Sequence, residues 1–349
     1  MAFSWNSLPK PIIGLSAMDG VTDAAMREIT KEVGGPDFMV TEFTSADGIV
    51  HGVAKLLRDF YYTLKQRPII AQIFGTNPET FYKTAIICAY LGFDGIDINM
   101  GCPADSIAKK GGGACLIQTP ELAQKLIRAV QTGIADWANG KSINDLGLPP
   151  TFVELLKLRA PNLQSLTPNL LPVSVKTRIG FDKPDTANWL PSLLETHPAV
   201  ITLHGRTLEQ QYSGKANWEE IAKAVEIAKG SGTLIFGNGD LTSQEVIHQR
   251  ISESGVDGVW VARAAMGNPW IFTNHSPTTQ ERFAVAIKHC EIFEEFNRTV
   301  FASDPYPFLN MRKHLGWYVK DFPDAALIRA KLFQTNNSVE VKQVLAEVL

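Results

Sequence analysis

The stretch IIAQIFGTNPETFYKTAIICAYLGFDGIDINMGCP, residues 69–103, contains the pattern that decides the fold. Two short, mostly apolar runs, Ile69–Phe74 and Gly95–Met100, flank a longer amphipathic segment, Pro78–Leu91. Strands buried on both faces have this composition, because helices cover both sides of a parallel sheet. The stretch therefore predicts one strand–helix–strand unit of such a sheet.

The same alternation extends from Ile12 to Arg263. The predicted strands are Ile12–Met18, Phe38–Phe43, Ile69–Phe74, Gly95–Met100, Pro172–Arg178, Ala199–His204, Thr233–Asn238 and Gly258–Arg263. The predicted helices between them include Thr22–Val33, Pro78–Leu91, Pro120–Asp136, Trp218–Lys229 and Ser243–Ser254, with Thr119 and Thr242 as helix starts. Eight such units predict an α/β fold, a closed (β/α)8 TIM barrel. A doubly wound open sheet is the alternative, and the absence of GxGxxG after the first strand disfavours it.

Two regions depart from this alternation. Residues 133–171 form a long insertion between the fourth and fifth strands, and Thr151–Arg159 within it is predicted to be an extra helix. From residue 277 onward the strand pattern stops and helical periodicity replaces it, as in Phe283–Phe296 and Ala325–Phe333. We therefore expect a barrel domain at 1–276 and a smaller all-helical domain at 277–349.

Composition bounds the class of protein. The 349 residues are 45% hydrophobic and 20% charged, which is typical of a globular protein with a large core. The N-terminus lacks a signal-peptide pattern, no apolar run approaches the roughly 18 residues of a membrane span, and the four cysteines form no CxxC pair. These features predict a soluble protein of the reducing cytoplasm, with no metal site and no obligatory protein partner evident. Because the net charge is −3, a nucleic acid would have to bind a local basic face.

Six consecutive predicted strands each end with at least one polar residue. The residues at these strand ends are Gln72; Asn99 and Cys102; Lys176 and Arg178; His204 and Arg206; Asn238, Gly239 and Asp240; and Ala262 and Arg263. In TIM barrels the carboxyl ends of the strands converge on the active site. A structural role could explain any one of these residues, but six successive strand ends indicate a shared site.

The last two strand ends predict an anion site. In Gly237–Asp240 the glycines allow backbone N–H groups to approach a phosphate closely, and Arg263 adds a positive fork. With Lys176 and Gln72 across the mouth, this arrangement suits flavin mononucleotide, FMN. Lys176 could stabilise negative charge on the reduced ring.

Cys102 follows a strand in the turn NMGCP and is the most informative single residue. A thiol with a pKa near 8.5 is largely protonated at neutral pH and can donate a proton. It could quench the carbanion character that hydride addition leaves on a polarised C=C bond. Cys88, Cys115 and Cys290 are interpreted instead as inert structural cysteines.

These motifs resemble the tRNA-dihydrouridine synthase family over nearly the whole chain. The matching segments are LSAMDGVTD (15–23), AQIFG (71–75), DINMGCP (97–103), VKTRIG (175–180), HGRT (204–207), GNGD (237–240), GNPWIF (267–272) and RKHLGWYVKDFP (312–323). NMGCP, HGRT and the last segment are the most specific of them.

The resemblance implies a cofactor, a reaction and a partner. Reduction of FMN by NADPH (or NADH) would precede reduction of the uracil 5,6 double bond in tRNA, with hydride passing to C6 and a proton from Cys102 to C5. The FMN phosphate would lie on Asn238, Gly239, Asp240, Ala262 and Arg263, and its ring would contact Ala17, Met18, Asp19, Gln72, Lys176 and His204. Asn99, Arg178 and Arg206 would lie near the substrate, and the helical domain would bind tRNA. The target base would have to be flipped out to reach the barrel mouth.

The chain departs from the family pattern in places. Ala17 stands where proline is frequent, and Ala262 and Ala264 stand where glycine is usual. The basic residues available for tRNA phosphates are Lys109, Lys110, Arg178, Arg206 and Lys215 near the mouth, and Arg312, Lys313, Lys320, Arg329 and Lys331 in the helical domain. The alternative functions are an FMN dehydrogenase of a free dihydropyrimidine or dihydroorotate and a non-catalytic RNA-binding barrel.

Overall fold

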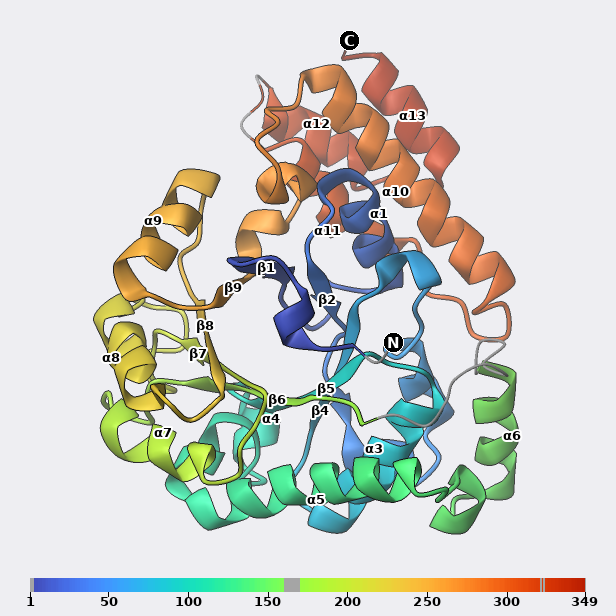
Figure 1. Cartoon of the computed structure of the whole chain (residues 1–349). Coiled ribbons are helices and arrows are strands. Elements are labelled where there is room, and N and C mark those ends of the chain that lie inside the picture. Colours follow the sequence, from blue (N-terminus) through green and yellow to red (C-terminus); the bar gives the residue numbers. More distant parts are fainter. Residues whose placement is uncertain (1–2, 160–169, 321, 323, 349) are drawn as a thin grey trace.

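The chain folds as a closed barrel of parallel strands with a helical part beyond it (Figure 1). The computed structural model describes residues 3–159, 170–320, 322 and 324–348. The strands are β1 (Ile12–Leu15), β2 (Phe38–Val40), β3 (Thr44–Ser45), β4 (Ile69–Phe74), β5 (Gly95–Met100), β6 (Val173–Arg178), β7 (Val200–His204), β8 (Leu234–Asn238) and β9 (Gly258–Val261). All pairings are parallel, and pairing of β2 with β4 closes the ring that runs from β1 through β9 back to β4. The predicted TIM barrel is confirmed.

The second predicted strand, Phe38–Phe43, is interrupted in the structure. It ends at Val40, and its continuation β3 pairs with the end of β4. The break occurs where the Thr41 hydroxyl, rather than a main-chain carbonyl, accepts the Gln72 N–H at 3.1 Å. β2 and β3 therefore act together as the second strand of the barrel.

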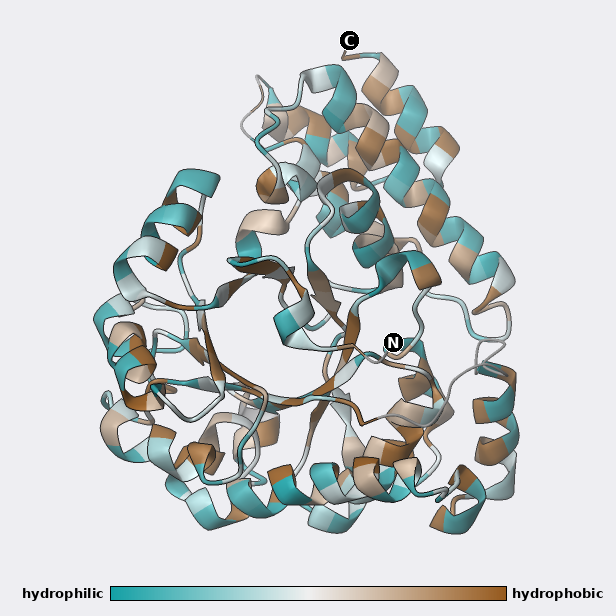
Figure 2. Ribbon diagram, in the orientation of Figure 1, coloured by the Kyte–Doolittle hydropathy of each residue, from teal (hydrophilic) through white to brown (hydrophobic). Residues whose placement is uncertain are grey.

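Helices surround the barrel with their apolar faces turned inward (Figure 2). They are α1 (Ala24–Gly34), α2 (Ala46–Val50), α3 (Pro78–Tyr90), α4 (Asp105–Ala108), α5 (Pro120–Ala138), α6 (Pro150–Arg159), α7 (Thr186–Leu194), α8 (Trp218–Ala228) and α9 (Gln244–Ser254). The predicted helix of the insertion is α6, while residues 160–169 of that insertion lie outside the described residues.

Of the two predicted threonine helix starts, Thr119 is confirmed and Thr242 is wrong by one residue. α9 is capped by Ser243, whose hydroxyl accepts from the Val246 N–H, so Thr242 lies one residue before the cap. Thr119 does cap α5, but its side chain makes no capping hydrogen bond. Pro120 at the first helical position explains this start instead, because its φ already suits a helix.

The helical part contains α10 (Thr279–Thr299), α11 (Leu309–Tyr318), α12 (Ala325–Leu332) and α13 (Ser338–Ala346). α10 begins with a capping box in which Thr278 and Glu281 bond each other's backbone N–H groups. It packs against α1 of the barrel and against α11 and α13. The predicted helical C-terminal part is confirmed.

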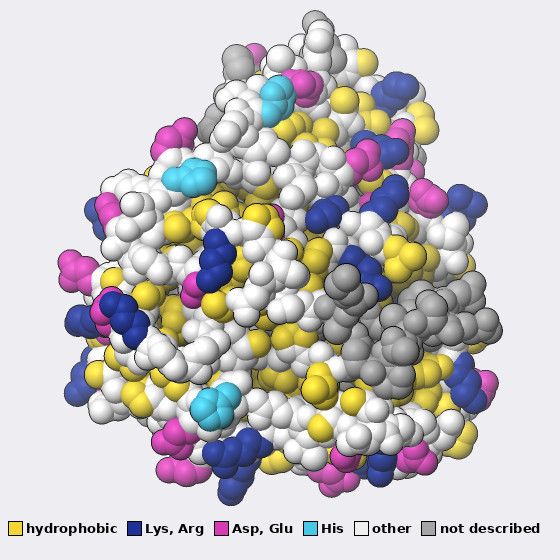
Figure 3. All heavy atoms as spheres, in the orientation of Figure 1, with side chains coloured by type: hydrophobic (Ala, Val, Ile, Leu, Met, Phe, Trp, Pro, Cys, Tyr) yellow, Lys and Arg dark blue, Asp and Glu magenta, His cyan; other side chains and the backbone are white. Residues whose placement is uncertain are grey.

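The amino-terminal end of the barrel is closed by aromatic residues. Trp5, in the short 3-10 helix η1 (Trp5–Ser7), packs edge-on against Phe38 and Phe236, with ring centroids 4.8 and 5.5 Å apart. η1 lies in front of the barrel in Figure 1. On the same face, Figure 3 shows basic and acidic side chains scattered around the periphery.

No helix of the described chain is both long and apolar enough to span a membrane.

Candidate active site

A cavity of about 1380 Å³ lies at the carboxyl ends of the strands. All of the predicted site residues except Arg206 line it: Ala17, Met18, Asp19, Gln72, Asn99, Cys102, Lys176, Arg178, His204, Asn238, Gly239, Asp240, Ala262 and Arg263. Ligand cavities commonly measure about 300–1000 Å³, so this one has room for more than one small ring system. Parallel strands bring these side chains together because all of their carboxyl ends face the same way.

A hydrogen-bonded chain of side chains connects β4, β5 and β6 at the base of the cavity. Asn99 Nδ2 donates to Gln72 Oε1 at 2.9 Å, and Gln72 Nε2 donates to Asp97 Oδ2 at 2.7 Å. The other oxygen of Asp97 accepts from the Ser174 hydroxyl at 2.7 Å. Burial raises the pKa of Asp97 to about 6, although Ser174 and Gln72 stabilise its charged form. The chain fixes both amides and leaves each with one N–H for the cavity.

Cys102 is held through its backbone on both sides. Its N–H donates to Asn99 Oδ1 at 2.9 Å, and its carbonyl accepts from the Ala114 N–H at 3.1 Å. Gly113 allows this second contact, because its φ is +58° and a Cβ there would lie 2.6 Å from the Cys102 carbonyl oxygen. Burial raises the pKa of the Cys102 thiol, and Asp19 adds to the increase. The thiol is therefore protonated at neutral pH, as a general acid must be.

Three basic side chains lie at the carboxyl ends of β6 and β7. Burial and the neighbouring Arg178 lower the pKa of Lys176 to about 8. Burial, with Lys176 and Arg178 nearby, lowers the pKa of His204 far below its ordinary value, so this imidazole is neutral. Arg178 donates from Nε to the Gly101 carbonyl at 2.8 Å and from Nη1 to the Thr207 carbonyl at 2.8 Å. It thereby fixes the turn that precedes Cys102 to the loop after β7.

The turn after β8 and the segment after β9 present main-chain donors. The N–H groups of Gly239, Asp240, Arg263 and Ala264 donate to no other described residue. Asp240 adopts the left-handed conformation with φ +54°, a conformation found in turns whose successive N–H groups bind anions. Ala262 has φ −115°, so this position does not demand the positive φ that favours the family's usual glycine. These donors and the half-exposed Arg263 guanidinium suit an anion.

Arg206, expected near the substrate, does not line the cavity. Its N–H donates to the His204 carbonyl at 2.7 Å, a tight turn that directs the side chain behind the cavity wall. There the buried guanidinium pairs with both carboxylate oxygens of Asp240, at 2.8 and 2.7 Å. Burial alone would raise the pKa of Asp240, but the Ala216 N–H and Arg206 outweigh it and hold that pKa below its usual value.

Several cavity residues were missed from the sequence. Gln211 and Tyr212 belong to the long loop after β7, and the Tyr212 ring lies 5.6 Å from the Arg263 guanidinium carbon. Arg282 of α10, Trp317 of α11 and Lys320, which follows α11, also line the cavity. The length of the 205–217 loop was the one available signal. The helical residues reach the cavity only through tertiary packing.

The structure also changes the interpretation of the basic residues in the helical part. Arg312 donates to the Thr335 carbonyl and the Asn336 side chain, and Lys313 donates to the Gly20 carbonyl of the barrel. Lys331 pairs with Glu347 at 2.6 Å. None of these three residues lines the large cavity, whereas Arg282 and Lys320 do.

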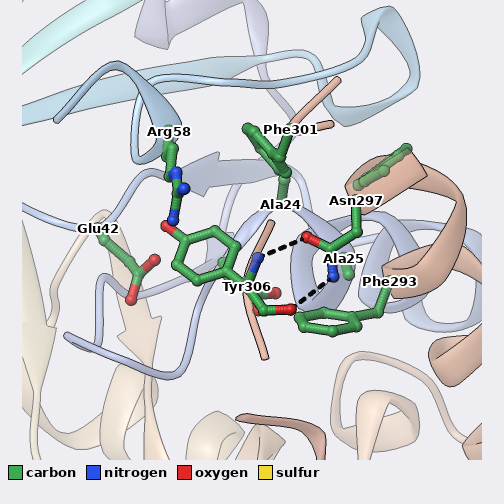
Figure 4. Close-up of a pocket in the computed structure, with 10 residues that line it drawn as sticks. Ala24, Ala25, Glu42, Arg58, Phe293, Asn297, Phe301 and Tyr306 are labelled. Carbon is green, nitrogen blue, oxygen red and sulfur yellow. Dashed lines mark hydrogen bonds between the residues drawn. The ribbon is translucent and has the colours of Figure 1, made fainter. Parts of the chain in front are cut away.

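A second, much smaller cavity lies between the barrel and the loop after α10 (Figure 4). The Asn297 side chain pairs with the main chain of Tyr306, accepting at 2.9 Å and donating at 3.0 Å. The Arg58 guanidinium carbon lies 4.4 Å from the Tyr306 ring centroid. Glu42 lines the same space, and burial with Asp23 and Asp59 nearby raises its pKa to about 8. This junction anchors the helical part and is separate from the large cavity.

Comparisons with known proteins point to one family. The family model described as dihydrouridine synthase matches residues 14–136 and 154–349. The chain is 29% identical over 348 residues to a probable tRNA-dihydrouridine synthase of Staphylococcus epidermidis, covering 98% of this chain and 94% of the relative. It is also 29% identical over 348 residues to the probable tRNA-dihydrouridine synthase 2 of Bacillus subtilis, covering 98% and 95%. Among solved structures, DHODH from Eimeria tenella in complex with ferulenol is similar with a TM-score of 0.46 and 14% identity, over 89% of this chain and 86% of that one.

Proposed function

The chain belongs to the dihydrouridine synthase family, and from that premise we propose that it is an oxidoreductase which reduces specific uridines of tRNA to 5,6-dihydrouridine. The large cavity at the strand ends would be its active site. One observation carries the chemical part of this proposal: the cavity contains a cysteine, Cys102, whose backbone is hydrogen-bonded on both sides and whose thiol is protonated at neutral pH.

The residues present fit FMN. The main-chain donors of Gly239, Asp240, Arg263 and Ala264, with the Arg263 side chain, would hold its phosphate. Lys176 and the remaining N–H of Gln72 would face the ring, while Ala17–Asp19 would line its other side. When bound and reduced by NADPH or NADH, the flavin would supply the hydride that C6 of the uracil receives.

The protein's own groups would manage the proton and orient the base. Cys102 would donate its proton to C5, and its raised pKa keeps that proton available. Asn99 would hold the base with its remaining N–H, because its other polar positions are already bonded to Gln72 and to the Gly101 and Cys102 N–H groups. Lys176, with a pKa lowered to about 8, would place a positive charge near the electron-rich ring.

We assign residues 277–349 to tRNA binding and residues 1–276 to catalysis. Arg282, Trp317 and Lys320 of the helical part border the same cavity as Cys102. A flipped uridine could thus enter the barrel while the flanking phosphates meet the helical residues.

The test uses purified protein, NADPH and tRNA from cells that lack dihydrouridine, with the product measured by mass spectrometry. The wild-type protein should form dihydrouridine in tRNA and leave free uridine unchanged. Cys102→Ala should be reduced by NADPH normally but make product roughly 10²–10⁴-fold more slowly. The control Cys115→Ala should stay active, because Cys115 does not line the cavity.

Absence of dihydrouridine with the wild-type protein would contradict the function. Turnover by Cys102→Ala at the wild-type rate would contradict only the assignment of the acid.

A further inference from the structure

The loop 205–217, between β7 and α8, borders the large cavity without any regular secondary structure to hold it. It contributes Gln211 and Tyr212 to the cavity lining. The Tyr212 side chain is 61% exposed and makes no hydrogen bond within the described chain. A loop of this kind must be positioned by contacts at its base.

Arg178 Nη1 donates to the Thr207 and Gln211 carbonyls, and Arg206 makes the contacts that join the two ends of the loop. Arg206 is 2% exposed, and its Nε and Nη2 donate to the Ser213 and Gly214 carbonyls at 3.1 and 2.6 Å. Its Nη1 lies 3.3 Å from His204 Nε2, and because arginine can only donate, the imidazole nitrogen must accept. Both ends of the loop are therefore joined by one guanidinium.

The remaining partner of Arg206 belongs to the anion site. Asp240 Oδ2 accepts from the Ala216 N–H at 2.8 Å as well as from Arg206, so this carboxylate also bonds the loop directly. The backbone N–H of the same residue is one of the main-chain donors of the anion site. A change in the backbone of the 238–240 turn must therefore move a side chain that is bonded to the loop.

We propose that Arg206 is a positioning residue that couples the 238–240 turn to the 205–217 loop, so that a phosphate bound on the turn and a ligand under the loop favour each other. The coupling is reciprocal, since the same contacts serve both sites. The identities of the two ligands, FMN and tRNA, rest on the proposed function, whereas the coupling rests on the contacts above. A lysine at position 206 could keep one of these contacts, but it could not bond the Asp240 carboxylate and the loop carbonyls at the same time, as the forked guanidinium does.

Trypsin cleavage after Lys215 provides a readout that needs no catalysis. Lys215 is exposed within the loop. In apoprotein prepared from the full chain, FMN should slow this cleavage, followed by mass spectrometry, by about fivefold or more, the lower end of usual coupling between sites. In Arg206→Met and Asp240→Asn the protection should be lost even at saturating FMN, and Arg206→Lys should restore part of it. The matched control Arg128→Met alters an exposed arginine on α5 and should behave as wild type.

A second measurement separates positioning from a general loss of structure. In Arg206→Lys the KM for tRNA should rise by about fivefold or more with a smaller change in kcat. Equal protection by FMN in wild-type protein and Arg206→Met, or no protection in either, would overturn the coupling. Protection that depends on Arg206 in a protein that forms no dihydrouridine would uphold the coupling and refute the proposed function instead.

Discussion

Lowering the pH should destabilise this protein through two buried histidines, His289 of α10 and His314 of α11. Their rings meet edge to face with centroids 4.8 Å apart. His289 Nδ1 lies 3.3 Å from the Tyr318 hydroxyl, while His289 Nε2 and both ring nitrogens of His314 have no partner among the described residues. Among the described residues neither ring has a carboxylate beside it to stabilise a positive charge, so both stay neutral in the fold.

The magnitude follows from the depressed pKa values. Burial lowers the pKa of His289 to about 3, and burial with His289 nearby lowers the pKa of His314 well below its ordinary value. The unfolded chain takes up these protons below about pH 6.5 and the folded chain does not, so stability is lost as the pH falls through that value. At about pH 5, each histidine that remains neutral should cost about 2 kcal/mol of unfolding free energy.

Other buried groups act in the opposite direction. Burial with Asp23 and Asp59 nearby raises the pKa of Glu42 to about 8, and burial with Asp19 nearby raises that of Asp59 to about 6. A carboxyl that stays protonated in the fold contributes stability that grows as the pH falls toward its unfolded value. The stability of the wild-type protein alone is therefore not diagnostic, and the comparison must be with a variant that lacks one histidine.

The variant is His314→Met, which fills a similar volume with an adaptable apolar side chain. Urea unfolding at about pH 7.5 and about pH 5 should show that the variant loses roughly 2 kcal/mol less than wild type on acidification. His248→Met, at an exposed position on α9, is the matched control and should lose as much as wild type. If His314→Met lost as much as wild type, the histidine would carry its charge in the fold and the reasoning would be wrong.

Two further predictions concern ligands. Arg263→Ala should release FMN more readily than Gln72→Ala, as measured by flavin fluorescence after dialysis. The reason is that Arg263→Ala removes a charge-assisted contact to the phosphate, whereas the Gln72 side chain is already bonded to its protein neighbours. Equal release from the two variants would mean that the phosphate binds elsewhere. Charge reversal at Arg282 and Lys320 should weaken tRNA binding and make its affinity less dependent on salt, with the slope of log affinity against log salt concentration falling by about one unit for each lost phosphate contact. Charge reversal at Lys125, which is exposed on α5, should change neither quantity. An unchanged slope in the Arg282 and Lys320 variants would mean that the RNA binds another face of the protein.

The barrel could be predicted from the sequence because strand composition and strand ends are local properties. Each apolar run indicated a buried strand. In a closed ring of parallel strands, the residues that follow the strands all lie at the same end of the barrel. That geometry brought Cys102, Lys176, His204 and Asn238 to one cavity without knowledge of any contact. Their chemical roles stay predictions.

Side-chain direction after a strand end could not be predicted in the same way. Arg206 lies only two residues after His204, yet the tight turn between them sends it behind the wall and onto Asp240. Likewise, Asp97 precedes Asn99 by two residues on β5 and was passed over as part of an apolar strand, although it anchors Gln72. Such assignments depend on backbone angles and on partners distant in the sequence.

The cavity wall itself depends on how the helical part meets the barrel. Gly267, six residues after the end of β9, has φ +65°, and a Cβ there would lie 2.5 Å from the Trp317 carbonyl carbon of α11. Lys313 donates to the Gly20 carbonyl in the loop after β1, and Arg58 pairs with Asp304 in the loop after α10. These three contacts, at separate points of the barrel, hold Trp317 and Lys320 against the cavity. The helical part is thus a wall of the candidate active site, and a barrel cut at residue 276 would lose that wall and expose the apolar face of α1 that α10 covers.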